Sequence, residues 1–151
     1  MVFAKTALLA LLTGVLFISV SHAQTRHRKA PVKHTTLNLK ASVAAGEKVF
    51  TQNCVSCHQV DGLGVPHMNP PLSKTDYVLG NNTRLIKIIL NGFNEDVDIN
   101  GERYSNAMAS HDFLKDQEIA NVLTYVRNSF GNKAPAITIA QVKAVRASNK
   151  K

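Results

Sequence analysis

Apolar residues recur at helical spacing in two C-terminal stretches of this 151-residue chain. The stronger pattern predicts an amphipathic helix over 116–130, where apolar side chains fall at i, i+3, i+4 and i+7. Gly131 follows it as a stop signal. The residues of this apolar stripe are Ile119, Val122, Leu123 and Val126. A weaker amphipathic pattern predicts a last short helix over about 139–147.

Two further short helices are predicted earlier in the chain. Apolar and small residues over 42–53 favour a helix with Ser42 as its N-cap. A second apolar cluster, over 83–91, lies between Asn82, a good N-cap residue, and Gly92, a good C-cap residue. Both helices are therefore expected to be short and to end at nearby capping or loop residues.

Long segments without a clear period separate these helices. Residues 59–82 hold three glycines and three prolines and are predicted to be a loop, and residues 92–113 are expected to be irregular. A loop this long inside a compact domain needs a reason, and wrapping a cofactor is one. No strand alternation stands out, so the predicted fold class is all-α, with short helices held by long loops.

The N-terminus has the pattern of a secretory signal peptide over 1–23. Lys5 precedes an apolar run at 7–20, and small residues come before a cleavage site between Ala23 and Gln24. An uncleaved membrane anchor is the alternative, although the run is shorter than the ~20 apolar residues that a spanning helix needs. The sequence thus predicts a periplasmic or otherwise exported protein.

The net charge of +8 is distributed unevenly. Residues 24–40, predicted to be a flexible linker, hold five basic and no acidic residues, and so do residues 133–151, predicted to be a C-terminal tail. The domain between them, 41–132, holds 7 basic and 10 acidic residues. Basic tails suit contact with an anionic membrane surface or an acidic partner, or they simply aid solubility. A nucleic-acid partner is not expected for an exported protein.

The sequence Cys54-Val55-Ser56-Cys57-His58 has the spacing of a haem c attachment motif. Two thiols at this spacing reach the two vinyl groups on one edge of a porphyrin, and the following imidazole can turn onto the iron. We therefore predict one covalent haem c, attached through Cys54 and Cys57, with His58 as the proximal ligand.

Three other uses of this cysteine pair are less well supported. A structural zinc site normally needs four ligands, often two such pairs, and the chain has only two cysteines. A thioredoxin-like dithiol should follow a strand and open a helix, whereas this pair closes a predicted helix. A structural disulfide is the third alternative.

The second axial ligand is predicted to be Met108, and three other candidates stay open. Met68 and His67 lie only ten and nine residues beyond His58, a short path around the macrocycle. Met108 lies fifty residues beyond His58, in an irregular stretch before the strongest helix. His111 is the remaining alternative. A His/Met pair raises the redox potential and leaves no open coordination site, which favours electron transfer.

Two of the predicted helices carry a matching pair of packing motifs. Gly46 and Phe50 form a Gly-x-x-x-aromatic pattern in the first helix. Val122 and Tyr125 supply apolar and aromatic residues in the strong C-terminal helix. With these motifs, residues 42–131 resemble the class I monohaem cytochromes c. The resemblance implies that these two helices cross closely at Gly46, with Phe50 beside Tyr125.

The segment 54–72 resembles the haem motif, glycine-rich turn and Pro-x-Leu of the same family. By that resemblance, the Pro70 carbonyl accepts a hydrogen bond from His58 Nδ1 and makes the imidazole more basic. Leu72 is expected to pack on the haem. The fold implied is the class I cytochrome c fold, wrapped around one haem.

The segment 101–108 (GERYSNAM) is similar to small cytochromes, and cytochrome domains, that accompany periplasmic dehydrogenases, copper nitrite reductases and terminal oxidases. In that group a tyrosine stands where Tyr104 does, and it implies packing near the haem or a hydrogen bond to a propionate. A loop-anchoring core tyrosine is the alternative. Ala109 departs from the proline that usually follows the methionine. Lys115 departs from the usual Ser or Thr N-cap, so a frayed first turn with Asp116 as its cap is expected.

These residues together predict a single-electron carrier and not an enzyme. Redox partner proteins (a dehydrogenase, a reductase or an oxidase) are expected to dock weakly and electrostatically. One alternative is a cytochrome subunit of a larger dehydrogenase or oxidase complex. A peroxidase or gas-binding haem protein is the other, and it requires an open or displaceable sixth position.

Overall fold

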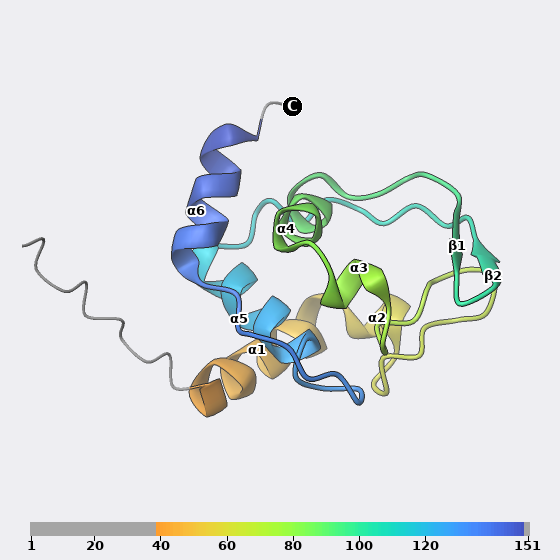
Figure 1. The fold of residues 1–151 in the computed structure, drawn as a ribbon, viewed down its shortest axis with the longest axis horizontal. Coiled ribbons are helices and arrows are strands. Elements are labelled where there is room, and N and C mark those ends of the chain that lie inside the picture. The colour runs from red at the N-terminus through yellow and green to blue at the C-terminus, as the bar shows by residue number, and fades with distance from the viewer. Residues whose placement is uncertain (1–38, 150–151) are drawn as a thin grey trace, which may run out of the picture. The chain divides into compact units, whose positions relative to one another are not determined.

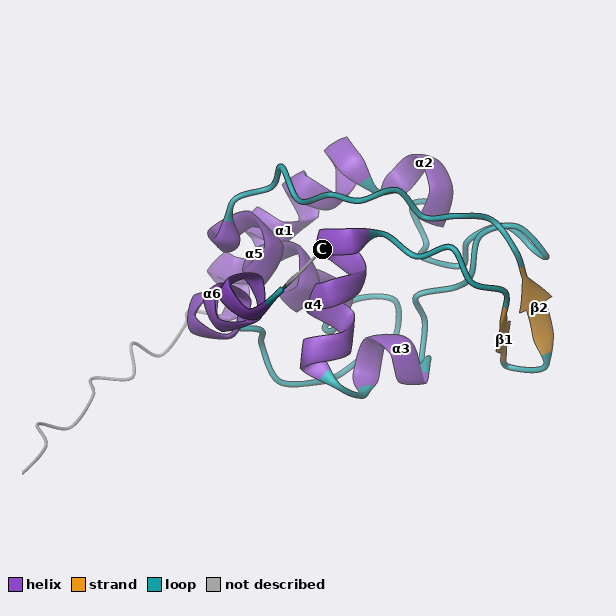
Figure 2. Ribbon diagram, turned by 90° about the horizontal axis from the view of Figure 1, so that it is seen from above, coloured by secondary structure: helices purple, strands orange, loops and turns teal. Residues whose placement is uncertain are grey.

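The structure is a computed structural model, in which residues 39–149 are placed well enough to describe. The predicted signal peptide and residues 24–38 of the predicted linker lie outside this range. In chain order the elements are α1 (Leu39–Asn53), α2 (Val55–His58), α3 (Asp76–Leu79), α4 (Asn82–Asn91), β1 (Val97–Ile99), β2 (Glu102–Tyr104), α5 (Asp116–Val126) and α6 (Ile139–Ser148). Figures 1 and 2 show α1, α4, α5 and α6 gathered together and the two strands away from them.

Helices α1 and α5 pack against each other at Gly46. A Cβ atom at this position would lie 2.1 Å from the Asn121 carbonyl oxygen and 2.7 Å from Tyr125 Cβ, so only glycine fits without a shift of the backbone. One turn later, Phe50 is 2 % exposed and its ring lies 5.4 Å from the Tyr125 ring. Phe130 closes this aromatic cluster, 5.3 Å from Phe50. The close helix crossing expected from the sequence is therefore present.

Substitution of Gly46 with alanine is expected to destabilise the protein by about 1–3 kcal/mol, the range of overpacking in a tight core. Alanine has the better helix propensity, so a loss of stability must come from the crossing itself. Chemical denaturation of the purified protein measures the effect, and Ala44→Val on the exposed face of α1 is the control. Equal stability of Gly46→Ala and the native protein would contradict the close packing.

Helix α1 begins earlier than predicted. It starts at Leu39, three residues before the expected start, and Ser42 lies buried inside it. The prediction of Ser42 as N-cap is therefore wrong, and residues 39–40 of the predicted linker are helical. The buried residues of α1 are Ser42, Gly46 and Phe50, each one helical turn apart, and Leu39 in the additional turn is 45 % exposed.

The predicted absence of strands in 92–113 is wrong, because β1 and β2 form an antiparallel hairpin. Val97 pairs with Tyr104 and Ile99 with Glu102. The connecting residues are Asn100 and Gly101, both with positive φ (55° and 83°). Asn-Gly is the strongest short-range signal for a two-residue hairpin turn, so this hairpin could have been recognised in the sequence.

The predicted loop 59–82 contains one short helix, α3. The Thr75 hydroxyl accepts a hydrogen bond from the backbone N–H of Val78, a normal N-cap. Helix α4 begins one residue earlier than predicted, since Asn81 and not Asn82 is its N-cap. The Asn81 side chain accepts from the Arg84 N–H at 3.0 Å.

The C-terminal segment predicted to be a basic tail packs on the domain over 133–149. Ile137 and Val142 are 1 % and 0 % exposed, and α6 lies against α4 and α5. The predicted helix over 139–147 is thus present as α6, but it belongs to the core. The basic residues of this segment masked the three apolar residues that are buried in it, Ile137, Val142 and Val145.

Helix α5 ends at Val126, four residues before the predicted end, and its start is stabilised in an unexpected way. Glu118 accepts a hydrogen bond from the Lys115 N–H at 2.8 Å, as the carboxylate of a capping box does. Asp116 is not the cap. Its carboxylate instead accepts from Arg146 Nε of α6 at 2.7 Å. The Arg146 guanidinium also donates to the Leu114 carbonyl at 2.7 Å, so α6 braces the turn before α5.

Removal of this brace by Arg146→Ala is expected to lower the free energy of unfolding by about 1–2 kcal/mol, because hydrogen bonds to a charged group are lost while the site stays partly solvated. Lys143→Ala, an exposed cation on the same helix, is the matched control and should change stability little. Thermal and chemical unfolding of the two variants measure this difference. Equal stability of both variants would show that Arg146 does not brace α5.

Candidate functional site

The end of α1 and the single turn of α2 bring the motif residues together. The Cys54 N–H donates to the Phe50 carbonyl at 2.8 Å, which continues α1 into the turn. Cys57 and His58 follow at i+3 and i+4 from Cys54, the spacings that share one face of a helical turn. Gln59, with φ of +62°, ends the turn. The two thiols and the imidazole therefore face the same side of the chain.

These side chains open into a cleft of about 380 Å³ between the helices and the hairpin. Its walls are largely apolar and include Phe50, Leu85, Ile89, Val122, Leu123 and Val126. All seven site residues predicted from the sequence line it: Cys54, Cys57, His58, Pro70, Leu72, Tyr104 and Met108. A cleft with an apolar lining, two thiols, one imidazole and one thioether fits the chemistry of a covalently attached haem.

The imidazole of His58 is fixed by the loop that follows it. His58 Nδ1 lies 3.1 Å from the Pro70 carbonyl oxygen. This carbonyl can only accept, so Nδ1 carries the proton and Nε2 keeps its lone pair in the neutral ring. Burial lowers the pKa of His58, while the hydrogen bond to Pro70 opposes that shift. The ring is thus held in the neutral tautomer that can bind a metal ion through Nε2.

The thiol of Cys54 lies deeper than that of Cys57. Burial, and secondarily the nearby Cys57, raises the pKa of Cys54 to about 11, whereas Cys57 is exposed. Both residues are free cysteines in the described chain. One edge of the cleft is therefore apolar and enclosed at Cys54, and it opens to solvent at Cys57.

Met108 reaches the cleft from the segment after the hairpin. Its backbone pairs with Phe93 through two hydrogen bonds, Phe93 N–H to Met108 O at 2.9 Å and Met108 N–H to Phe93 O at 2.6 Å. Gly92 has φ of +76°, and a Cβ atom there would lie 2.4 Å from the Met108 carbonyl oxygen. The backbone just after α4 thus fixes the position of the Met108 backbone at the cleft.

The alternative axial ligands lie in different places. Met68 and His67 are exposed and do not line the cleft among the described residues. His111 does line it, but both its ring nitrogens lie close to backbone carbonyl oxygens, Nδ1 2.9 Å from Ala109 and Nε2 3.3 Å from Asn53. Of the four candidates, Met108 and His111 therefore line the cleft and Met68 and His67 do not.

Leu72 and Tyr104 line the cleft from two different loops. The Leu72 N–H donates to the Gly62 carbonyl at 2.7 Å, which folds the glycine- and proline-rich segment back on itself. Tyr104 is 5 % exposed, and its hydroxyl donates to Glu102 at 2.6 Å. This hydrogen bond is the largest cause that raises the pKa of Tyr104 to about 12, followed by burial and the negative charge of Glu102. The tyrosine already has a hydrogen-bond partner within its own hairpin.

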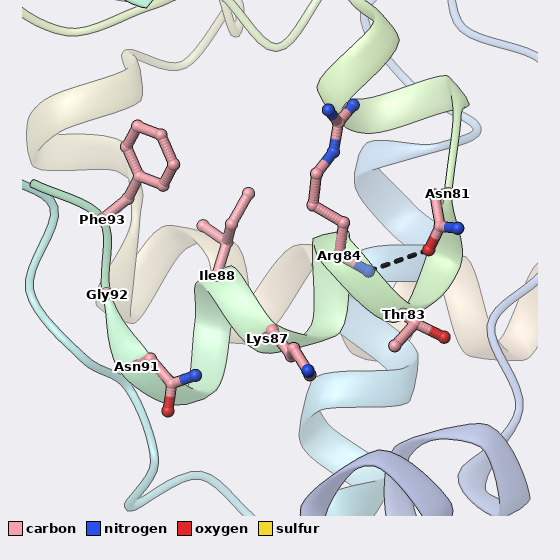
Figure 3. A pocket seen from close by; sticks show the side chains of 8 residues that line it. All are labelled: Asn81, Thr83, Arg84, Lys87, Ile88, Asn91, Gly92 and Phe93. Atoms are coloured by element: carbon pink, nitrogen blue, oxygen red, sulfur yellow. Dashed lines mark hydrogen bonds between the residues drawn. The ribbon is translucent and has the colours of Figure 1, made fainter. Parts of the chain in front are cut away.

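A second hollow lies on the outer side of α4 (Figure 3). It is open, and its lining mixes polar and charged residues such as Arg84, Lys87 and Asn91 with apolar ones. Its lining includes no Cys, His or Met, so it offers none of the ligands expected for a haem. Ile88 and Phe93 line both hollows and form part of the wall between them.

Comparison with known proteins decides the family. The family model described as "Cytochrome c" matches residues 43–130. This chain belongs to the cytochrome c family. Members of the family bind haem c and are electron-transfer proteins, and their mostly helical fold agrees with that of residues 39–149.

Three relatives illustrate the range of this cytochrome c family. Cytochrome c-552 of Thermus thermophilus is 33 % identical over 118 residues, which cover 72 % of this chain and 79 % of the relative. The cytochrome c subunit of a quinone alcohol dehydrogenase from Gluconacetobacter polyoxogenes is 34 % identical over 121 residues, 74 % of this chain and 25 % of that subunit. The cytochrome subunit of a fructose dehydrogenase from Gluconobacter japonicus is 31 % identical over 145 residues, which cover 87 % of this chain and 26 % of that subunit. The chain thus spans about a quarter of the dehydrogenase subunits.

None of the helices within residues 39–149 combines the length and apolar character that crossing a bilayer requires.

Proposed function

We propose that this cytochrome c holds one haem c, attached through Cys54 and Cys57, with His58 and Met108 as axial ligands, and that it carries single electrons between redox proteins outside the cytoplasm. The observation that carries the proposal is the meeting of two thiols, one imidazole and one thioether in one apolar cleft. When bound, the haem supplies an iron that alternates between Fe(II) and Fe(III).

The residues of the chain have separate roles in this proposal. Cys54 and Cys57 hold the cofactor, and Pro70 keeps His58 in the neutral tautomer. Met108 fills the sixth position, which favours electron transfer over oxygen or peroxide chemistry. Leu72 and Tyr104 contribute to the cleft wall and exclude water from it. The exposed position of Cys57 supports electron exchange at that edge.

We further propose that the partners are redox enzymes. A subunit of a larger dehydrogenase complex is a second candidate, supported by relatives that are cytochrome subunits of alcohol and fructose dehydrogenases. The basic residues of 24–38 are proposed to contact an anionic membrane or an acidic partner after export. Edman or mass analysis of the mature N-terminus should show Gln24 as its first residue.

Protein-film voltammetry tests the carrier proposal. A reversible one-electron wave, with one haem per chain and no turnover of added hydrogen peroxide, is the expected result. A catalytic wave with peroxide would instead favour an enzyme with an open sixth position. The size of the native protein after gentle extraction separates the free carrier from the subunit, because a subunit should migrate with its complex.

A further inference from the structure

We infer that His111 is a positioning residue that ties the Met108 segment to the end of α1 that carries Cys54. This inference rests on the proposed function, in which Met108 is the ligand that completes the iron site. The contact would hold two separate parts of the chain in a fixed position relative to each other. These parts are the haem-attachment turn and the segment 107–112 that contains Met108.

On one side, the segment 107–112 is fixed to the end of α4. Besides the backbone pair between Met108 and Phe93, the His111 N–H donates to the Ile89 carbonyl at 2.8 Å. The Ser110 hydroxyl donates to the Leu90 carbonyl at 2.7 Å. These bonds place the segment on α4, but none of them connects it to the turn that holds the two cysteines.

On the other side, the ring of His111 reaches α1. His111 Nε2 lies 3.3 Å from the carbonyl oxygen of Asn53, the last residue of α1 and the neighbour of Cys54. The last four carbonyls of a helix have no intrahelical donor, so Asn53 offers an acceptor that a side chain can bind. The neutral ring carries a single N–H, and we assign it to Nε2, where it makes this contact a hydrogen bond between the ligand segment and the attachment turn.

The second ring nitrogen, which carries no proton in this tautomer, contacts the segment itself without donating a hydrogen bond to it. His111 Nδ1 lies 2.9 Å from the carbonyl of Ala109, the residue after Met108. Ala109 leaves its backbone φ free, whereas a proline would restrict it. The Phe113 ring packs against the imidazole at 5.7 Å between centroids. His111 thus contacts the residue after the ligand with one nitrogen and the residue before Cys54 with the other.

The two nitrogens can be tested separately, because the side-chain amide of glutamine ends near the place of Nε2 and that of asparagine near Nδ1. His111→Gln can keep the bond to Asn53, whereas His111→Asn and His111→Ala lose it. The test uses the full-length, haem-loaded protein and measures binding of free imidazole to the oxidised form, where imidazole must displace Met108. We expect binding about tenfold tighter in the Asn and Ala variants and within about twofold of wild type in the Gln variant, since one hydrogen bond contributes roughly a factor of ten.

A control histidine lies outside the cleft, at position 67. His67→Gln removes a side chain that does not line the cleft and should leave imidazole affinity unchanged. Equal affinity in the Gln and Asn variants of His111 would show that the bond to Asn53 does not matter. If the Ala variant binds imidazole with wild-type affinity, the inference about His111 is overturned but Met108 ligation is not. A wild-type protein that shows no methionine–iron absorption band when oxidised would overturn both Met108 ligation and this inference.

Discussion

Replacement of both Cys54 and Cys57 with alanine is expected to abolish covalent haem attachment. Each cysteine lines the cleft and supplies one of the two thiols available in the whole chain, so no other residue can form a thioether. Any haem that still enters the cleft should be released into acidified acetone, and the extracted polypeptide should be colourless. Absorbance of the polypeptide after extraction measures this directly.

The matched control for this prediction is Ser56→Ala. Ser56 is exposed, lies between the two cysteines and also borders the cleft, so the substitution disturbs the same turn without removing a thiol. This variant should keep its colour after extraction. Haem that stays bound to the double cysteine variant would contradict thioether attachment, and haem loss from Ser56→Ala would point to the turn and not to the thiols.

Substitution of Met108 with alanine is expected to have the second largest effect. The thioether is replaced by water or by an added ligand, and this lowers the potential because a methionine ligand stabilises Fe(II). A decrease on the order of 100 mV is expected, a fraction of the roughly 0.8 V over which axial ligands tune haem potentials. Voltammetry gives the potential, and loss of the methionine–iron band in the oxidised spectrum reports the ligand.

The control for Met108 is the other methionine of the described chain. Met68 is 49 % exposed and lies outside the cleft lining, so Met68→Ala should leave both the potential and the band unchanged. Reversed effects of the two variants would assign the sixth position to Met68. Unchanged properties in both would make His111 the ligand to test next.

Much of the fold could be predicted from local signals in the sequence. The stripe of α5 and the motif of α2 each lie within a short segment, and the close crossing at Gly46 followed from the resemblance to cytochromes c. The hairpin was missed although Asn100-Gly101 is a strong local signal, because its flanking strands have only three residues each.

The packing of the C-terminal segment could not be predicted from its composition. Its basic residues suggested a solvated tail, and only the tertiary structure shows that Val142 is buried and that Arg146 binds the turn before α5. The same holds for the start of α5, where an arginine from a distant helix holds the carboxylate expected to cap it. Long-range contacts of this kind leave no periodic pattern in the sequence.

Part of the candidate site could likewise be predicted from the sequence, and part depends on long-range contacts. The attachment residues stand next to one another in the chain, so their spacing alone indicates the chemistry. Met108 could be favoured by its distance from His58. Of the four candidates, Met108 and His111 line the cleft, whereas Met68 and His67 are exposed. The contact of His111 with Asn53 joins residues 58 positions apart, and neither local sequence contains a signal that predicts it.

The visible spectrum of the purified, matured protein, recorded oxidised and reduced and again after acid–acetone extraction, tests the proposed haem c site most directly. We expect that the haem stays with the polypeptide, that its pyridine adduct has the spectrum of haem c, and that the oxidised protein shows the methionine–iron band. A polypeptide that loses its haem on extraction, or never carries one, would contradict covalent attachment at Cys54 and Cys57.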